Sequence, residues 1–270
     1  MEFGVVVPSS YSAGGIIRAA KVTEESDLRY FFATDHYMMP NINSTVDAWT
    51  ILGAVAALTR NIRIGTCVTP IPFRPPAQLA KVVATVDHIS HGRAILGVGC
   101  GWSSSEFLGF SSWDENGTIR ARKTREALNL ILALWNKKSA VDFSGKYYSA
   151  EGAVLEPKPV QDPCIPLWFG TEGQYMLKVA ARMAYGWLPP VSGISLEEYS
   201  TVISALRDEE KRIGRKDHVR VACNGTISKL NSNLIEQYAK LGCEIALLTK
   251  MPEKNLDEQI TKFAEESKSW

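Results

Sequence analysis

The chain has 270 residues, 45% of them hydrophobic, and its 30 basic and 29 acidic residues leave a formal charge of +1. This length suits one large domain or two small ones. The balanced charge gives no electrostatic reason to expect nucleic acid or a membrane surface as a partner. The amino terminus, MEFGVVVPSS, predicts a first strand rather than a signal peptide, because its second residue is acidic and its apolar run is short. No apolar run approaches the roughly 18 residues of a membrane-spanning helix.

The five cysteines are scattered along the chain and form no CxxC pair. This spacing predicts free thiols in a reducing cytoplasm rather than disulfides or a zinc site. We therefore expect a cytoplasmic protein without a metal centre.

Apolar runs and amphipathic segments alternate from one end of the chain to the other. Eight short apolar runs predict strands, at residues 2–7, 29–34, 62–68, 94–98, 166–169, 186–188, 219–224 and 244–249. Eight segments with apolar residues at helical spacing predict helices, at residues 14–25, 47–58, 77–90, 119–135, 173–184, 196–213, 232–240 and 256–267. Eight β/α units favour a closed (β/α)₈ TIM barrel over an open doubly wound sheet. Because no low-complexity linker divides them, residues 1–270 are expected to form one domain.

One segment breaks this alternation. Residues 141–155 carry aromatic side chains around Ser144-Gly145, which predicts a small hairpin inserted after the fourth helix.

A parallel α/β fold places its chemistry in the loops at the carboxyl ends of its strands. Asp35 and His36 directly follow the second predicted strand. A histidine there suits proton donation or acceptance near neutral pH, although it could equally serve only to hydrogen-bond its loop. His88, His91 and His218 lie at the opposite ends of strands and are expected to be caps or surface groups.

The loop Gly97-Val98-Gly99-Cys100-Gly101-Trp102 has the first glycines of a GxGxxG dinucleotide fingerprint but lacks the third glycine and the acidic partner. Its glycines still allow the backbone to approach a flat ring or an anion. Trp102 either lines a pocket or covers the core. Glu106 is either an acid near the substrate or a solvated charge at a helix start.

A strand, a glycine turn and a helix start follow one another in the sequence Trp168-Phe169-Gly170-Thr171-Glu172-Gly173-Gln174. Backbone N–H groups at such a helix start, together with the Thr171 hydroxyl, form a nest that can bind a phosphate. The alternative is an ordinary turn that uses glycine. Arg120 and Arg122, at the head of a long helix, could reach a phosphate or could simply be solvated.

Several blocks of this sequence, in this order, resemble the bacterial luciferase-like superfamily of flavin- and deazaflavin-dependent oxidoreductases. The resemblance covers nearly the whole chain and is densest in ATDHY (33–37), RIGTCVTPIPFRPPAQLAK (63–81), VDHISHGRAILGVGCGW (86–102), EPKPVQDPCIPLWFGTEG (156–173) and AARMAYGW (180–187). It implies an (α/β)₈ barrel that holds reduced FMN or the deazaflavin coenzyme F420 at the carboxyl ends of its strands.

The resemblance also implies roles for individual residues. The Cys67–Val68 bond matches a non-proline cis peptide that many members place behind the ring, and His36 matches a histidine near the reactive edge of the cofactor. The candidate catalytic residues are His36 and Glu106. The candidate cofactor-binding residues are Asp35, Thr66, Cys67 and Val68 near the ring, Gly99, Cys100, Gly101 and Trp102 along the ring or ribityl chain, and Arg120, Gly170, Thr171 and Gly173 at the phosphate.

Two features depart from the family pattern. Several deazaflavin enzymes place a tryptophan shortly after the histidine, where this chain has Tyr37-Met38-Met39-Pro40. The loop after the sixth strand, residues 189–195, is short, which indicates an open site or one that a partner subunit completes. A homodimer is implied by the resemblance alone.

The resulting hypothesis is an F420-dependent oxidoreductase that transfers a hydride to or from a small organic substrate. The first alternative is an FMN-dependent luciferase-like monooxygenase that uses O₂. Two further alternatives are a non-catalytic flavin-binding homologue and a barrel aldolase or isomerase that binds a substrate phosphate at residues 170–173. The aldolase would need a lysine at the end of a strand, for which Lys250 is the candidate.

Overall fold

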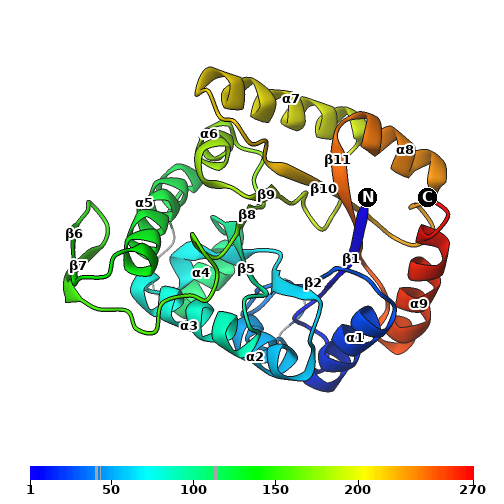
Figure 1. Cartoon of the computed structure of the whole chain (residues 1–270), viewed down its shortest axis with the longest axis horizontal. Coiled ribbons are helices and arrows are strands. Elements are labelled where there is room, and N and C mark those ends of the chain that lie inside the picture. Colours follow the sequence, from blue (N-terminus) through cyan, green and yellow to red (C-terminus); the bar gives the residue numbers. More distant parts are fainter. Residues whose placement is uncertain (40–41, 43, 112–114) are drawn as a thin grey trace.

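In the computed structural model, which describes residues 1–39, 42, 44–111 and 115–270, parallel strands form a closed barrel inside a ring of helices (Figure 1). The barrel strands are β1 (Glu2–Val7), β2 (Tyr30–Ala33), β3 (Arg63–Thr66), β4 (Thr69–Pro70), β5 (Ala94–Gly99), β8 (Leu167–Phe169), β9 (Gly186–Trp187), β10 (Arg220–Gly225) and β11 (Cys243–Leu248). Strands β3 and β4 both pair with β5 and share one position in the barrel. Since β1 pairs with both β2 and β11, the ring is complete, and the predicted TIM barrel is confirmed.

The helices in the described residues are α1 (Ala13–Glu25), α2 (Ala48–Leu58), α3 (Pro76–Ile89), α4 (Ser104–Ser111), α5 (Gly117–Asn136), α6 (Gln174–Met183), α7 (Leu196–Arg212), α8 (Ser232–Lys240) and α9 (Leu256–Ser267). Two short 3₁₀ turns, η1 (Ile71–Phe73) and η2 (Glu253–Asn255), follow β4 and β11. Helix α4 is not among the predicted helices, because it is short and begins with serines. None of the described helices is long and apolar enough to cross a membrane.

Side-chain caps explain where several helices begin. Ser12, Asp47, Asn116 and Asn231 each accept a hydrogen bond from the backbone N–H three residues later. Ser195 and Glu198 form a complete capping box at the start of α7. These contacts satisfy N–H groups that have no partner within the helix.

The predicted hairpin is confirmed as β6 (Val141–Ser144) paired antiparallel with β7 (Ser149–Ala153). It extends to one side of the barrel (Figure 1). The Glu126 carboxylate on α5 accepts the backbone N–H groups of Lys146, Tyr147 and Tyr148, at 3.1, 2.7 and 2.8 Å. This carboxylate therefore holds the hairpin turn against the helix.

Large side chains fill the inside of the barrel where a neighbouring strand carries glycine. A Cβ at Gly186 would lie 2.5 Å from the Trp168 ring, and a Cβ at Gly4 would lie 2.6 Å from Tyr30 Cβ. Trp168 and Tyr30 are both almost fully buried, and their ring centroids are 5.6 Å apart. The interior is therefore packed by alternating large and small residues, as in other barrels of this kind.

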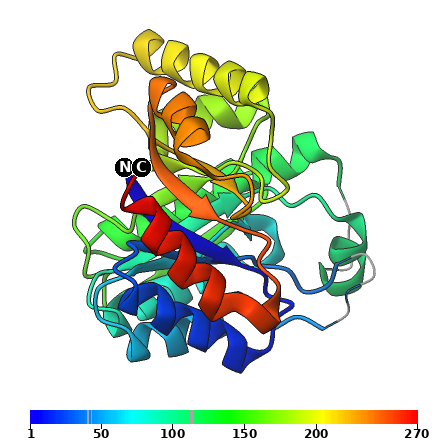
Figure 2. The ribbon, with the colours of Figure 1, turned by 90° about the vertical axis from the view of Figure 1, so that its right-hand side faces the viewer.

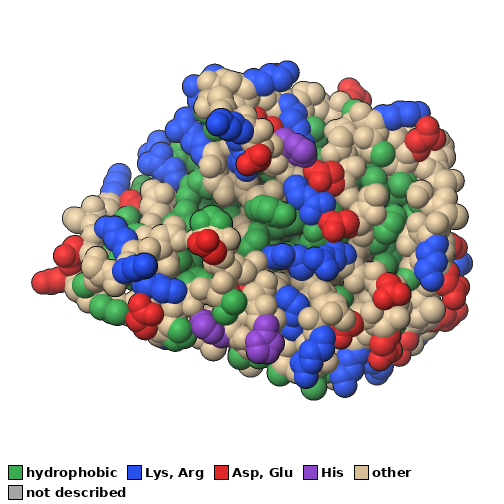
Figure 3. Space-filling model, in the orientation of Figure 1, with side chains coloured by type: hydrophobic (Ala, Val, Ile, Leu, Met, Phe, Trp, Pro, Cys, Tyr) green, Lys and Arg blue, Asp and Glu red, His purple; other side chains and the backbone are tan. Residues whose placement is uncertain are grey.

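A polar cluster closes the amino-terminal end of the barrel. Arg220 donates to Glu2 Oε2 at 2.6 Å, Glu244 Oε2 at 2.7 Å and the Tyr30 hydroxyl at 2.9 Å. Figure 3 shows acidic and basic side chains together near the middle of the face. The start of the chain lies close to this position in Figure 1, which has the same orientation. The two chain ends lie near each other at this end (Figures 1 and 2), where the Phe3 and Trp270 ring centroids are 6.0 Å apart. The carboxyl ends of the strands, where the candidate residues follow, lie at the opposite end.

We expect Gly97→Ala to destabilise the protein by about 3 kcal/mol or more, because the added methyl group overpacks the barrel wall. Its Cβ would lie 1.8 Å from the Thr66 carbonyl oxygen. The matched control is Gly53→Ala in α2, where an added Cβ would meet no described atom within 4 Å. This control should stabilise the helix by about 0.5–1 kcal/mol. Urea unfolding followed by circular dichroism measures both, and equal stability of Gly97→Ala and wild type would contradict the packing argument.

Candidate active site

His36 and Glu106 meet at the carboxyl end of the barrel, although 70 residues separate them in the chain. His36 Nδ1 lies 3.0 Å from Glu106 Oε2 and 3.2 Å from Oε1. The Glu106 carboxylate is 1% exposed and also accepts the backbone N–H of Tyr37 at 2.9 Å and of Met38 at 3.3 Å. A carboxylate only accepts hydrogen bonds, so the imidazole is assigned a proton on Nδ1. Nε2 is then the ring nitrogen that remains available to exchange a proton. The alternative of a solvated charge at Glu106 is wrong.

Trp102 lies beside this pair. Its side chain is 60% exposed, and its ring meets the His36 ring edge-on with centroids 5.9 Å apart. It therefore does not cover the core. It borders the surface from which His36 is reached, and the side chain of His36 is itself 15% exposed.

The Cys67–Val68 peptide between β3 and β4 is cis, as the resemblance implied. The Cys67 thiol belongs to the cluster inside the barrel, and burial raises its pKa to about 12, so that it stays protonated near neutral pH. Val68 is partly buried against the same cluster, and its side chain lies across two glycines. A Cβ at Gly99 would lie 2.5 Å from Val68 Cγ2, and a Cβ at Gly170 would lie 2.8 Å from Val68 Cγ1. Val68 and the two glycines form a surface that we call the floor.

Asp35 is held by Arg74, a residue that the sequence analysis did not select. The Asp35 carboxylate is 1% exposed and receives Arg74 Nη1 at 2.7 Å, Arg74 Nη2 at 3.0 Å and the Thr69 hydroxyl at 2.8 Å. Burial alone would lower the pKa of Arg74, but the Asp35 carboxylate outweighs burial and raises it. The side chain of Asp35 is thus occupied, which leaves its main chain for any contact with a cofactor. The only sequence signal for Arg74 was its place in the proline-rich loop after a strand.

Thr66 is fully buried, and its hydroxyl lies 3.0 Å from the Thr69 hydroxyl, to which it can donate because the Thr69 proton goes to Asp35. The Thr69 hydroxyl in turn accepts from Trp49 Nε1 at 2.9 Å. These contacts fix the end of β3 directly below the cis peptide.

The loop after β5 turns at Gly101, whose φ is +76°. A Cβ there would lie 2.7 Å from the Phe107 ring, so that only glycine fits both the angle and the space. Arg120 lies on the same ring, with Cζ 4.9 Å from its centroid. Cys100 is partly buried, and burial raises the pKa of its thiol. The structure therefore brings Gly99, Cys100, Gly101 and Trp102 together with α4, and it places Arg120 beside this loop.

The loop after β8 leads into α6. The Thr171 carbonyl accepts Trp187 Nε1 at 2.7 Å, which fixes the loop, and Gly173 is the N-cap residue. Among the described residues no side chain caps this helix, so its first N–H groups point to the space in front of it. This is the geometry that an anion site at a helix start requires.

The loop that follows β9 is fixed by two strand ends. Asn224 Nδ2 donates to the Pro190 carbonyl at 2.8 Å, and Lys250 Nζ donates to the Ser192 carbonyl at 2.6 Å. Lys250, the candidate lysine of an aldolase, is thus engaged in holding this loop. Pro40, in the departure from the family pattern at residues 37–40, lies outside the described residues.

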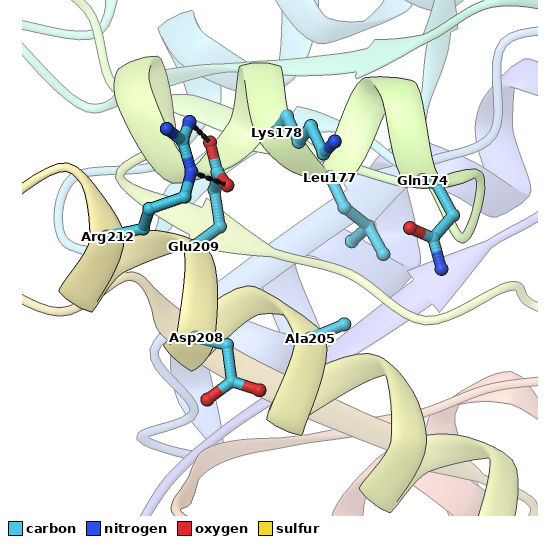
Figure 4. Close-up of a pocket in the computed structure, with 7 residues that line it drawn as sticks. All are labelled: Gln174, Leu177, Lys178, Ala205, Asp208, Glu209 and Arg212. Carbon is cyan, nitrogen blue, oxygen red and sulfur yellow. Dashed lines mark hydrogen bonds and ion pairs between the residues drawn. The ribbon is translucent and has the colours of Figure 1, made fainter.

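Two cavities lie outside the barrel. One, of about 250 Å³, lies between α6 and α7 and is lined partly by the Glu209–Arg212 ion pair (Figure 4). The other, of about 430 Å³, lies between η1, α5 and the hairpin, with Arg74 and Phe110 in its wall. Neither contains His36, Glu106 or Val68 among its lining residues.

A closed parallel barrel with a buried histidine–carboxylate pair at the carboxyl ends of its strands defines a TIM-barrel protein with a site in the usual place for this fold. The chain belongs to the luciferase-like monooxygenase family, whose model matches residues 1–258. The five cysteines are free, as predicted.

Two relatives illustrate the range of this family. An uncharacterized protein of Mycobacterium tuberculosis is 29% identical over 279 residues, covering 96% of this chain and 94% of that protein. The phthiodiolone/phenolphthiodiolone dimycocerosates ketoreductase of the same organism is 30% identical over 216 residues, covering 76% of this chain. The matched part is 55% of that ketoreductase.

Solved structures share the fold at lower identity. An F420-dependent secondary alcohol dehydrogenase in complex with an F420–acetone adduct has a TM-score of 0.85 at 19% identity, covering 98% of this chain and 97% of that one. The monooxygenase RslO1 from Streptomyces bottropensis has a TM-score of 0.83 at 20% identity, covering 98% of both chains. The coenzyme F420-dependent tetrahydromethanopterin reductase of Methanopyrus kandleri has a TM-score of 0.82 at 20% identity, covering 98% of this chain and 97% of that one.

We expect Glu106→Gln to reverse the His36 tautomer. The amide oxygen can still accept the Tyr37 N–H, but the amide nitrogen then donates to Nδ1, which moves the imidazole proton to Nε2. Nitrogen-15 NMR of histidine-labelled protein measures this directly, because the chain has four histidines and His36→Gln assigns the signal. The same tautomer in wild type and Glu106→Gln would rule out the assigned hydrogen bond.

Proposed function

We propose that this chain, acting as one domain over residues 1–270, is an F420-dependent oxidoreductase that transfers a hydride to or from a small organic substrate. The observation that carries the proposal is the His36–Glu106 pair at the same end of the barrel as the floor of Val68, Gly99 and Gly170. It combines a group for proton transfer with a surface that a flat ring can cover.

The residues at the floor fit a flat ring. Gly99 and Gly170 contribute no side chains, and the close contacts of Val68 with both leave no room for a Cβ at either position. Cys67 points into the barrel, so its thiol does not occupy the surface above. A ring lying on Val68 would therefore contact apolar atoms and backbone, with Trp102 at one side.

The tail of the cofactor would extend toward α6. Thr171 and Gly173 would hold its phosphate with backbone N–H groups, since Gly173 begins a helix without a side-chain cap. Gly170, whose own N–H donates to the Val98 carbonyl at 2.9 Å, would line the phosphate site without a side chain. Arg120 lies on the Phe107 ring beside the Gly99–Trp102 loop, and we propose it as a cation for the tail.

The ring, when bound, supplies or accepts the hydride. His36 exchanges the matching proton: Nε2 gives it to a carbonyl oxygen during reduction or takes it from a hydroxyl during oxidation. Glu106 holds Nδ1–H and stabilises the imidazolium when His36 carries both protons. Burial of Glu106 at 1% exposure strengthens this interaction.

An FMN-dependent monooxygenase is the second candidate, because the family is that of luciferase-like monooxygenases and RslO1 is a monooxygenase. The same floor and the same helix start would serve FMN. The aldolase alternative is less well supported, because the lysine it needs donates to the Ser192 carbonyl. We further propose a cytoplasmic homodimer, in keeping with the free cysteines and the family resemblance.

The direct test is a spectroscopic titration of the purified chain with F420 and with FMN, in air and without oxygen. The proposal expects F420 to bind and to be reduced or oxidised by an alcohol or ketone. Binding of FMN with oxygen consumption would favour the monooxygenase. A protein that binds neither chromophore would exclude both candidates.

We expect Gly99→Ala to weaken cofactor binding by about tenfold or more, because the new methyl group pushes Val68 into the ring site. The double variant Gly99→Ala/Val68→Ala removes the contact at 2.5 Å and should recover most of the affinity. Fluorescence titration gives both dissociation constants. Unchanged affinity in Gly99→Ala would place the ring elsewhere.

We expect His36→Ala to retain cofactor binding and to slow the redox step by about 10²–10⁴-fold, the usual contribution of a proton-transfer group. Stopped-flow absorbance at the cofactor band measures the rate with any substrate found active. A variant that reacts at the wild-type rate would remove His36 from proton transfer.

A further inference from the structure

We propose that Arg74 is the residue that positions His36, an inference that rests on the proton role proposed above. Arg74 contacts both chain neighbours of His36. It pairs with the Asp35 carboxylate through two N–H groups at 2.7 and 3.0 Å, and its Cζ lies 5.0 Å from the centroid of the Tyr37 ring. The histidine is thus held through the residue before it and the residue after it.

Tyr37 is clamped further by aromatic contacts. Its ring stacks on Phe73 at 5.3 Å and lies 4.9 Å from the Phe110 ring, measured between centroids. Its backbone N–H donates to Glu106 at 2.9 Å, the same carboxylate that receives His36. Arg74 therefore holds the side chains of the two neighbours while Glu106 holds the imidazole and the Tyr37 N–H, and the two residues together fix where the imidazole lies.

Arg74 is itself fixed. Its side chain is 13% exposed, and Nη2 also meets Asp47 Oδ2 at 2.7 Å. Asp47 caps α2, so the guanidinium joins the end of β2 to the start of α2. Burial would raise the pKa of Asp47, but its hydrogen bonds with Thr50 and Arg74 lower it.

The planar guanidinium suits this position better than an ammonium. It can meet both oxygens of Asp35, a second carboxylate and an aromatic face at the same time. A lysine could keep the charge but only part of this geometry. Without the cation, Asp35 would be left buried, with the Thr69 hydroxyl as its remaining side-chain partner among the described residues.

Arg220 provides a matched control at the other end of the barrel. It also pairs with two carboxylates, Glu2 and Glu244, and with one tyrosine, Tyr30. Its side chain is 22% exposed, comparable to Arg74. If both arginines are purely structural, loss of either one lowers the stability of the whole molecule in the same way. If Arg74 positions His36, only the loss of Arg74 changes the tautomer signals of His36.

The experiment compares full-length wild type, Arg74→Met, Arg74→Lys and Arg220→Met by nitrogen-15 NMR of labelled histidine. We expect His36 to lose its Nδ1–H tautomer preference in Arg74→Met and to lose part of it in Arg74→Lys. We expect wild-type His36 signals in Arg220→Met even though its unfolding temperature falls. If Arg74→Met does not fold, Arg74→Lys, which retains the cation, carries the test.

Wild-type His36 signals in a folded Arg74 variant would overturn the proposal, and so would an equal change in Arg220→Met. Titration of each variant with F420 and with FMN separates this result from the proposed function. If wild type binds neither cofactor, the proposed function fails, while the coupling of Arg74 to His36 is still decided by the NMR signals. If wild type binds and the signals do not move, the positioning role alone fails.

Discussion

The close approach of β3 to β5 is the constraint on which the candidate site depends. A Cβ at Gly97 would lie 1.8 Å from the Thr66 carbonyl oxygen, so the two strands can meet at this distance only with glycine on β5. At this contact the chain turns through the Cys67–Val68 peptide, which sends Cys67 into the barrel and leaves Val68 on the floor. Side chains missing from β5 and β8 thus determine the shape of the floor as much as the side chains present.

Buried or half-buried carboxylates that accept backbone N–H groups hold several distant loops of this chain. Three of them follow the same pattern: Glu24 binds the N–H groups of residues 60–62, Asp87 those of residues 160–161, and Glu126 those of residues 146–148. Glu106 binds two such groups and, in addition, the His36 imidazole. Glu106 therefore fixes its loop in the same way as the other three carboxylates. It differs from them in that it also binds the His36 imidazole. This also explains why Glu106 is buried: a solvated carboxylate would exchange these N–H groups with water.

The strands and helices could be predicted because their periodicity is local. Runs such as residues 94–98 and the helical spacing at 119–135 carry their own signal, and eight repeats of it indicate closure of the barrel. Helix α4 has no comparable pattern, since its buried residues, Glu106 and Phe107, follow three serines. The contacts of the site could not be predicted for a different reason. Arg74 meets Asp35 across 39 residues and Glu106 meets His36 across 70, and periodicity does not specify which loops converge at the end of a barrel.

The two ends of the barrel use similar chemistry for different purposes. At the amino-terminal end, Arg220 joins residues at the starts of β1, β2 and β11 with its own strand, so that a single guanidinium connects four strands where they begin. Burial alone would lower its pKa, but the bonds to Glu244 and Glu2 raise it, so the guanidinium stays charged near neutral pH. At the carboxyl-terminal end, Arg74 joins no barrel strand to another within the described part of the chain. It binds the residue that follows β2, a ring in the loop beyond it and the cap of α2, all of which are parts of loops or helix starts. Because the strands are already connected at their beginnings, the loops at their ends are free to be arranged for chemistry. Arg74 can therefore position the His36 side chain rather than close the sheet.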